Sequence, residues 1–213
     1  MTDSGKVLVL LGAESTGKSW LAKALCKALL DEGHDAVVVP EYLRLFCEAH
    51  GRTPRADEQP GIADAQTQRI AQAAGNHAVV IADTSALMTA VYSAHLFADA
   101  SLHPLAIATQ RLYAATLLTA LDLPWVADGF QRDGPKPRQQ IDNDLRAVLV
   151  EHGLPFSVIH GAGPARLVSA LAAVRPALCK PPDVVAGERW RWTCPNCDGE
   201  PCLPLVRPQA APT

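Results

Sequence analysis

The sequence predicts an α/β fold in which helices cover both faces of a five-stranded parallel sheet. Short apolar runs alternate with segments of helical periodicity from residue 6 to about residue 174. The chain has 213 residues, of which 48% are hydrophobic and 19% charged, which suits one packed domain with an appendage. Eight of the 17 prolines fall in the last 38 residues. We therefore expect one domain over residues 1–175 and a tail over residues 176–213.

Local signals set the expected limits of the strands and helices. Gly33 ends the first helix, Pro40 ends the second strand, Ser85 caps a helix and Pro104 lies in the first turn of the next one. Residues 51–60 and 124–138 are expected loops, and residues 161–163 precede the last helix, which ends near residue 174. The expected strands are residues 6–11, 35–39, 78–82, 116–123 and 156–160; the other expected helices are residues 20–30, 63–76, 85–97, 102–114 and 139–152.

A phosphate-binding pattern lies between the first expected strand and the first expected helix. Gly12 and Gly17 are five positions apart and are followed by Lys18 and the hydroxyl residue Ser19. Glycines allow main-chain N–H groups to surround phosphate oxygens, and the positive end of the following helix faces the same anion. Lys18 would reach the β- and γ-phosphates of ATP, and Ser19 would coordinate Mg²⁺. The expected nucleotide contacts here are Gly12, Ala13, Glu14, Ser15, Thr16, Gly17, Lys18, Ser19 and Trp20.

Two carboxylates follow other expected strands. Asp83 ends the strand at residues 78–82 and is the candidate ligand of Mg²⁺, with a polar strand terminator as the alternative. Glu41 follows the strand at residues 35–39 and would accept or orient the proton of an attacking hydroxyl group. Its alternative role is that of a solvated glutamate at a helix start. Because carboxyl ends of parallel strands meet at one edge, both acids are expected beside the phosphates.

Further candidates are cations and aromatic rings. A mobile basic segment would cover the transferred phosphoryl group, with a merely solvated loop as the alternative. Arg132 would contact the nucleotide, and Arg138 is the preferred catalytic arginine because it starts a helix and is better anchored. Tyr42, Tyr92 and Trp125 are aromatic residues that could stack on a planar substrate ring. The alternative is that these rings only fill the core. The candidate substrate contacts are Glu41, Tyr42, Arg44, Tyr92, Trp125 and Asp128.

Charge and cysteine content limit the classes of partner. The formal net charge of −3 gives no general attraction to nucleic acid or anionic lipid, and no apolar run is long enough to cross a membrane. We expect a cytoplasmic protein that acts on a small molecule, and the oligomeric state stays open. Cys194 and Cys197 form a two-residue knuckle with Cys202 five positions later, which is a candidate Zn²⁺ site. Cys179 or His160 could supply the fourth ligand, and the alternative is three reduced thiols.

Four segments that include the motifs described above give the chain a family resemblance. It resembles the ribosylnicotinamide kinase domain of NadR-type NAD-biosynthesis proteins, which are P-loop small-molecule kinases. The resemblance covers about residues 6–174, and Glu14-Ser15-Thr16 is its most distinctive part. The matching segments are residues 12–19, 39–44, 83–84 with 91–93, and 124–129. The family fold implies three layers and the strand order 2-3-1-4-5. Relatives often carry a second aspartate at the position of Ser85, tryptophan at that of Tyr92, and arginine one position before Arg132.

The resemblance implies ATP-dependent, Mg²⁺-assisted phosphorylation of the ribose 5′-hydroxyl of nicotinamide riboside. The pyridinium cation of that substrate suits an aromatic face and nearby carboxylates. The DNA-binding and adenylyltransferase modules of bifunctional relatives are not expected, because the first strand begins at Lys6. The alternatives are a P-loop kinase for another nucleoside or small hydroxyl substrate, a regulatory ATPase whose tail recruits a partner, and a zinc-ribbon protein that binds nucleic acid.

Overall fold

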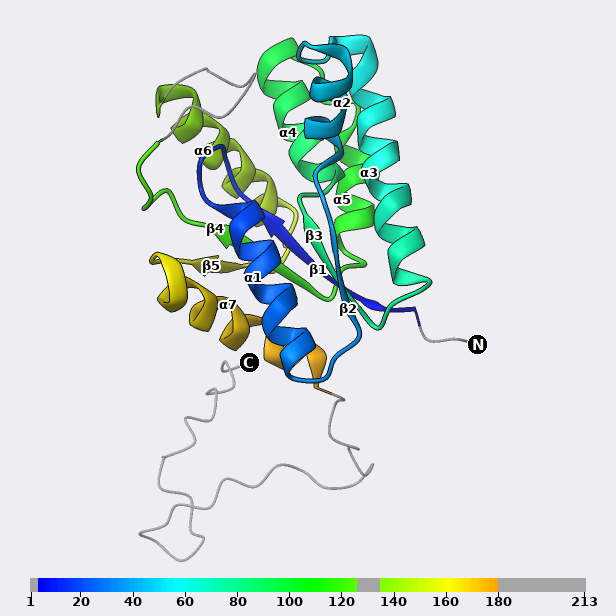
Figure 1. Cartoon of the computed structure of the whole chain (residues 1–213). Helices are drawn as coiled ribbons and strands as arrows, with labels where there is room; N and C mark the ends of the chain where they lie inside the picture. Colours follow the sequence, from blue (N-terminus) through cyan, green and yellow to red (C-terminus); the bar gives the residue numbers. More distant parts are fainter. Residues whose placement is uncertain (1–3, 126–134, 180–213) are drawn as a thin grey trace, which may run out of the picture. The chain divides into compact units, whose positions relative to one another are not determined.

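The described part of the chain contains the expected parallel sheet. The computed structural model describes residues 4–125 and 135–179. β1 (Lys6–Leu11) lies at the centre, between β3 (Val79–Asp83) and β4 (Ala115–Thr119). β2 (Ala36–Val39) and β5 (Ser157–Ile159) form the two edges, so the order is 2-3-1-4-5 and every pair is parallel (Figure 1). The strand order implied by the resemblance is confirmed.

Helices cover both faces of this sheet. α1 (Lys18–Asp31) and α7 (Gly163–Leu178) pack side by side on one face. α3 (Gln59–Ala74), α4 (Ala86–Phe97) and α6 (Pro135–Glu151) cover the other face (Figure 1). α4 contacts both α3 and α6. The structure therefore has the three layers expected of this fold class.

The alternation of side chains along β1 explains why both faces need cover. Val7, Val9 and Leu11 belong to the core under α3, α4 and α6. Leu8 and Leu10, which point the other way, belong to the core under α1 and α7. A strand that is apolar on both faces stays out of water only if helices cover both sides.

Several elements differ from the expected ones. α2 (Tyr42–His50) was not expected as a helix. It packs on α3, and a loop and the 3₁₀ helix η1 (Ala56–Glu58) connect the two helices. α5 (His103–Gln110) is four residues shorter than predicted at its C-terminal end. β4 ends at Thr119 rather than at residue 123, because its partner β5 pairs only with residues 117–119. α6 begins at Pro135, so Arg138 lies inside a helix and the prediction that the loop extends to Arg138 is wrong.

The described unit ends with α7. This helix continues past Pro176 to Leu178, and the ammonium group of Lys6 donates to the carbonyl oxygens of Ala177 (2.9 Å) and Leu178 (3.2 Å). The compact unit that contains the sheet ends at Cys179. Within residues 4–125 and 135–179, no helix is both long and apolar enough to cross a bilayer. Cys194, Cys197 and Cys202 lie outside the described residues, and so do Asp128 and Arg132.

Candidate functional site

The loop between β1 and α1 has the backbone of an anion-binding nest. Gly12 has a φ of +147°, Ser15 of +53° and Gly17 of +75°, so left-handed residues recur along it. A β-carbon at Gly12 would collide with the side-chain oxygen of Thr119, which explains the need for glycine there. Such alternation turns successive N–H groups towards one side of the chain.

The first turn of α1 offers further donors. Gly17 is its N-cap residue, and no side chain caps the helix by hydrogen bonding. The first N–H groups of a helix have no partner within the helix, and the helix dipole makes that end positive. A phosphate group bound in the loop would satisfy these donors, as expected from the sequence.

Lys18 lies folded against the loop. Its ammonium group donates to the carbonyl oxygens of Gly12 (2.7 Å) and Ala13 (2.8 Å). Burial lowers the pKa of Lys18, and the negative charges of Glu41, Asp83 and Glu14 oppose that effect. The carboxylates of Glu41, Asp83 and Glu14 are therefore close enough to Lys18 to raise its pKa.

Asp83 has the environment expected of a metal-directing carboxylate. It ends β3 beside Leu10 of β1 and is only 5% exposed. Its buried Oδ1 atom has no hydrogen-bond partner in the part of the chain that the structure describes, a costly state for a carboxylate unless a cation or water is bound. Among the described residues, no group of three or more His, Cys, Asp or Glu side chains makes a metal site by itself. Asp83 and the hydroxyl group of Ser19 fit Mg²⁺ if phosphate oxygens and water complete the shell.

The loop opens into a cavity of about 550 Å³, here called the phosphate cavity. It brings together most of the expected nucleotide contacts with candidates from α2 and α4. Trp20, which follows Ser19 in the sequence, also lines the cavity and is 49% exposed. Asp83 is not among its lining residues. The expected site residues that line this cavity are Gly12, Glu14, Ser15, Thr16, Gly17, Lys18, Ser19, Trp20, Glu41, Arg44 and Tyr92.

A second cavity of about 420 Å³ adjoins the first and is here called the α2–α4 cavity. It is lined by α2, α3, α4 and the loop that joins α2 to α3. Among the described residues that line it, Glu14 and Glu41 are the only charged ones and none is basic. The residues that line both cavities are Glu14, Glu41, Thr84, Met88 and Tyr92.

Thr84 and its neighbours are wall residues that the sequence did not single out. Thr84 has a φ of +100°, an outlier for a β-branched residue, and its buried hydroxyl group has no hydrogen-bond partner. Ser85 accepts a bond from the N–H of Leu87 (3.3 Å) and donates to Gln110 (2.7 Å). Ser85 is therefore occupied in capping α4. The backbone strain at Thr84 depends on packing around the strand end, so no sequence signal would have revealed it.

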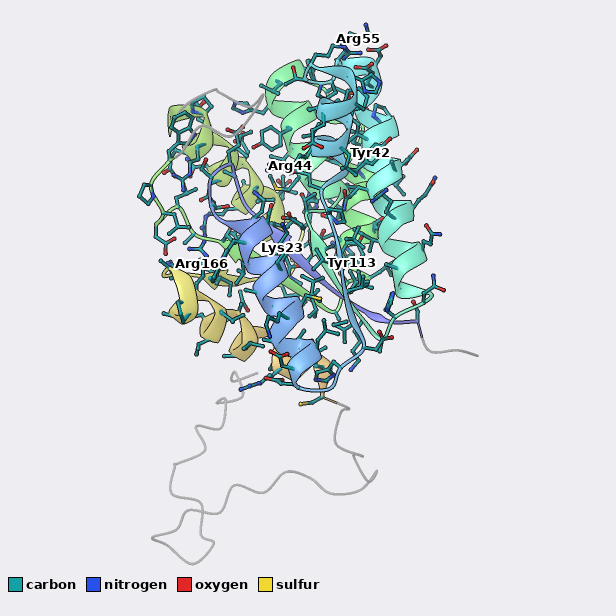
Figure 2. All side chains as sticks on the ribbon, viewed as in Figure 1. Lys23, Tyr42, Arg44, Arg55, Tyr113 and Arg166 are labelled. Atoms are coloured by element: carbon teal, nitrogen blue, oxygen red, sulfur yellow. The ribbon has the colours of Figure 1, made fainter. Side chains whose placement is uncertain are left out.

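Two expected site residues lie elsewhere than predicted. Tyr42, labelled in Figure 2, lines neither cavity. Its ring centroid lies 5.9 Å from the guanidinium carbon of Arg69. The main-chain N–H of Tyr42 is bound by Gln66 of α3 (2.7 Å), which turns the start of α2 in that direction. Trp125 also lines neither cavity, and its Nε1 atom is buried without a partner.

Arg138 is 7% exposed, and it donates to the carbonyl oxygens of Leu123 (3.0 Å) and Ser15 (3.5 Å). These contacts are available because α6 begins earlier than expected and carries Arg138 in its first turn. Arg138 is therefore anchored near the start of a helix, as expected for it, and contacts the phosphate-binding loop at the Ser15 carbonyl group.

Comparisons with known proteins agree with this architecture. A family model described as an AAA domain (AAA_28) matches residues 7–166. A NadR protein solved in complex with NAD and AMP-PNP aligns with 23% identity and a TM-score of 0.66, over 88% of this chain and 52% of that one. A NadR protein solved in complex with NR aligns with 22% identity and a TM-score of 0.67, over 82% of this chain and 51% of that one.

The present chain thus spans about half the length of these NadR proteins. No curated protein matches its sequence. The expected likeness to NadR is confirmed at the level of the fold. Because the family model matches most of the chain, from β1 to the first turn of α7, the chain belongs to the AAA_28 family of AAA domains.

Proposed function

We propose that this protein is an ATP-dependent kinase that phosphorylates the ribose 5′-hydroxyl group of nicotinamide riboside. The observation that carries the proposal is the shared wall of the two cavities. Glu14, Glu41, Thr84, Met88 and Tyr92 line both, so a nucleotide held by the loop and an acceptor in the α2–α4 cavity would meet at that wall. Phosphoryl transfer depends mainly on such positioning and on charge stabilisation.

The residues on the phosphate side have distinct roles in this proposal. Main-chain N–H groups of residues 12–19 would bind the phosphates, and Lys18 would exchange its two carbonyl partners for phosphate oxygens. Arg138 would add a fixed positive charge behind the loop. Ser19 and Asp83 would hold Mg²⁺, which when bound neutralises charge on the transferred phosphoryl group.

Glu41 is our candidate for the proton acceptor. The acceptor oxygen would bond to the γ-phosphorus as the bond from that phosphorus to the bridging oxygen breaks, and ADP would leave. The hydroxyl proton would pass to the Glu41 carboxylate. Glu41 lies in the shared wall of the two cavities, just before the first turn of α2, where a carboxylate can reach both the nucleotide side and the acceptor side.

The chemistry of the α2–α4 cavity supports a cationic acceptor. Of the wall residues that the structure describes, the charged ones are the acids Glu14 and Glu41, while Met88, Tyr92 and Phe97 supply soft and aromatic surface. A pyridinium ring is stabilised by carboxylates and by an aromatic face, and an anionic acceptor would be repelled. The NadR protein solved in complex with NR has this fold, which further supports nicotinamide riboside as the acceptor.

An acceptor panel tests the proposal. We expect the full chain, with Mg·ATP, to convert nicotinamide riboside to the mononucleotide with a kcat/KM at least about tenfold above that for adenosine, uridine or nicotinic acid riboside. ADP release and mass spectrometry of the acceptor measure this.

Two outcomes would contradict it. A preference for another nucleoside would favour the alternative kinase. ATP turnover that no acceptor accelerates would favour a regulatory ATPase, and truncation at residue 179 would then test whether the tail recruits its partner.

A further inference from the structure

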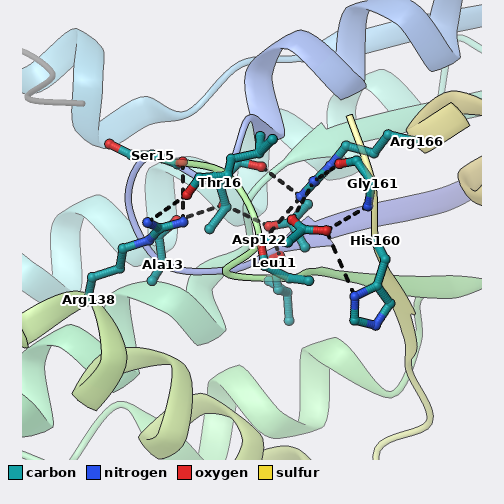
Figure 3. A network of polar contacts seen from close by, with 12 residues as sticks. Leu11, Ala13, Ser15, Thr16, Asp122, Arg138, His160, Gly161 and Arg166 are labelled. Atoms are coloured by element: carbon teal, nitrogen blue, oxygen red, sulfur yellow. Dashed lines mark hydrogen bonds and ion pairs between the residues drawn. The ribbon is translucent and has the colours of Figure 1, made fainter. Parts of the chain in front are cut away.

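A fully buried arginine of α7 contacts the phosphate-binding loop, 150 residues earlier in the sequence. Arg166 lies in the first turn of α7 and is 1% exposed. One terminal nitrogen of its guanidinium group donates to the carbonyl oxygen of Thr16 at 2.8 Å and lies 3.4 Å from that of Ala120 (Figure 3). Thr16 stands in the middle of the loop, so α7 holds the loop directly.

The other side of the same guanidinium group is also occupied. Its second terminal nitrogen donates to Asp122 Oδ1 (2.8 Å) and to the carbonyl oxygen of Gly161. Asp122 Oδ2 accepts from the main-chain N–H of Gly161 (2.6 Å). Burial would raise the pKa of Asp122, but the hydrogen bonds from Arg166 and Gly161 outweigh it and the pKa is lowered. The buried charge of Arg166 is thus compensated and its orientation fixed.

A second set of contacts holds the side chain of Thr16. Its hydroxyl group donates to the carbonyl oxygen of Ala13 (2.9 Å), and the hydroxyl group of Thr119 lies 2.7 Å away. Both the side chain and the carbonyl group of Thr16 therefore have set directions. From α6, Arg138 approaches the preceding carbonyl oxygen, that of Ser15, at 3.5 Å.

The geometry of a peptide group gives this contact a consequence. A trans peptide is planar, and its C=O and N–H groups point in opposite directions. A donor that holds the Thr16 carbonyl group therefore also fixes the direction of the next N–H, that of Gly17, which lines the phosphate cavity. A charged donor on the carbonyl oxygen also polarises the peptide and strengthens its N–H as a donor.

We propose that Arg166 is a positioning residue for phosphate binding: by holding the Thr16 carbonyl group, it directs the Gly17 amide towards a bound polyphosphate. The proposal deepens the proposed function and rests on the phosphate half of it alone. An apolar residue at this position would serve packing equally well. What the arginine adds is a defined direction for the loop.

Binding of inorganic tripolyphosphate with Mg²⁺, measured by calorimetry on the full chain, tests this. We expect Arg166→Met to weaken binding at least about tenfold, as on loss of a charge-assisted contact. Arg166→Lys, which keeps the charge but reaches fewer acceptors, should lie between Arg166→Met and wild type. Val174→Ala on α7 serves as a stability control, because Val174 is fully buried and is remote in sequence from the loop.

The tripolyphosphate affinities of the Arg166 variants decide whether the proposal stands. If Arg166→Met does not fold, Arg166→Lys decides, with an expected loss of about threefold to tenfold in tripolyphosphate affinity and an unchanged KM for the acceptor. The proposal is overturned if the folded Arg166 variants bind within twofold of wild type, or if Val174→Ala weakens binding as much as they do. Because tripolyphosphate is the probe, the test does not depend on which acceptor the enzyme uses.

Discussion

The phosphate cavity takes most of its wall from one stretch, residues 12–20, whereas the α2–α4 cavity takes most of its wall from residues 41–97, in α2, α3, α4 and the segments beside them. The first wall is held by main-chain geometry and by buried contacts from Thr119, Arg138 and Arg166. The second is mainly a surface of side chains from three helices. Thr84, whose buried hydroxyl group has no hydrogen-bond partner among the described residues, lies in the wall that the two cavities share. Under the proposed function, this difference would give a fixed site for the phosphates beside an acceptor site whose specificity depends on individual side chains.

The largest expected effect is on the fixed side. Lys18→Ala should lower kcat by about two orders of magnitude or more, because it removes the cation that would stabilise the transferred phosphoryl group. Lys23→Ala, an exposed change on the same helix, should have little effect. Initial rates with saturating Mg·ATP and nicotinamide riboside measure both. Similar rates for wild type and Lys18→Ala would show that the loop does not act on the reacting phosphate.

Asp83→Asn should come next. The change leaves the fold of β3 in place but removes the charge that would direct the metal. We expect the Mg²⁺ concentration for half-maximal rate to rise roughly 10- to 100-fold, as for other residues that orient a bound metal. A Mg²⁺ titration against the exposed control Asp64→Asn measures this. An unchanged titration curve would assign Asp83 to strand termination instead.

Tyr92 and Tyr42 sharpen the comparison on the acceptor side. Tyr92 lines both cavities, whereas Tyr42 lies under Arg69 and lines neither. We expect Tyr92→Ala to raise the KM for nicotinamide riboside about tenfold, with the KM for ATP nearly unchanged, because a cation–π contact is lost. Tyr42→Ala should leave both values close to wild type. Equal effects of the two variants would restore the sequence-based role of Tyr42.

The smallest expected effect concerns the ion pair at the start of α3. Hydrogen bonds from Arg52, followed by one from the Arg55 main chain, lower the pKa of Glu58 to about 2 from an ordinary 4.5. A carboxyl group whose pKa is lowered by folding stabilises the fold fully at pH values above its ordinary pKa of 4.5. This contribution to the free energy of unfolding is lost as the pH falls from 4.5 towards 2.

Thermal unfolding from pH 6 to pH 2 tests the prediction. Glu58→Gln should be slightly less stable than wild type at pH 6, and the two curves should converge near pH 2. A difference that stays constant across this range would mean that the Glu58 charge does not contribute.

The same comparison explains how far the sequence could predict the molecule. The sheet and the loop at residues 12–19 could be predicted because each follows from contiguous residues: apolar runs for the strands, and two glycines, a lysine and a serine for the loop. Their strand order followed from the family resemblance. Asp83 also lies where parallel topology requires, at the end of β3.

The acceptor side could be predicted only in part, because its walls depend on packing between distant segments. Tyr42 appeared suitable by residue type, yet contacts with Gln66 and Arg69 of α3 hold it away from the cavities. Arg138 was expected where a loop meets a helix, and only the early start of α6 shows it bonded to Leu123 and Ser15. The role of Arg166 depends on a contact across 150 residues of sequence.

Phosphorus NMR of the full chain with Mg·ATP and nicotinamide riboside tests the central claim most directly, because it identifies both the bond that breaks and the bond that forms. The account predicts that the γ-phosphate signal is replaced by a phosphomonoester signal coupled to the 5′-methylene protons of the riboside, together with ADP. Accumulation of inorganic phosphate alone, or an unchanged ATP spectrum, would contradict it.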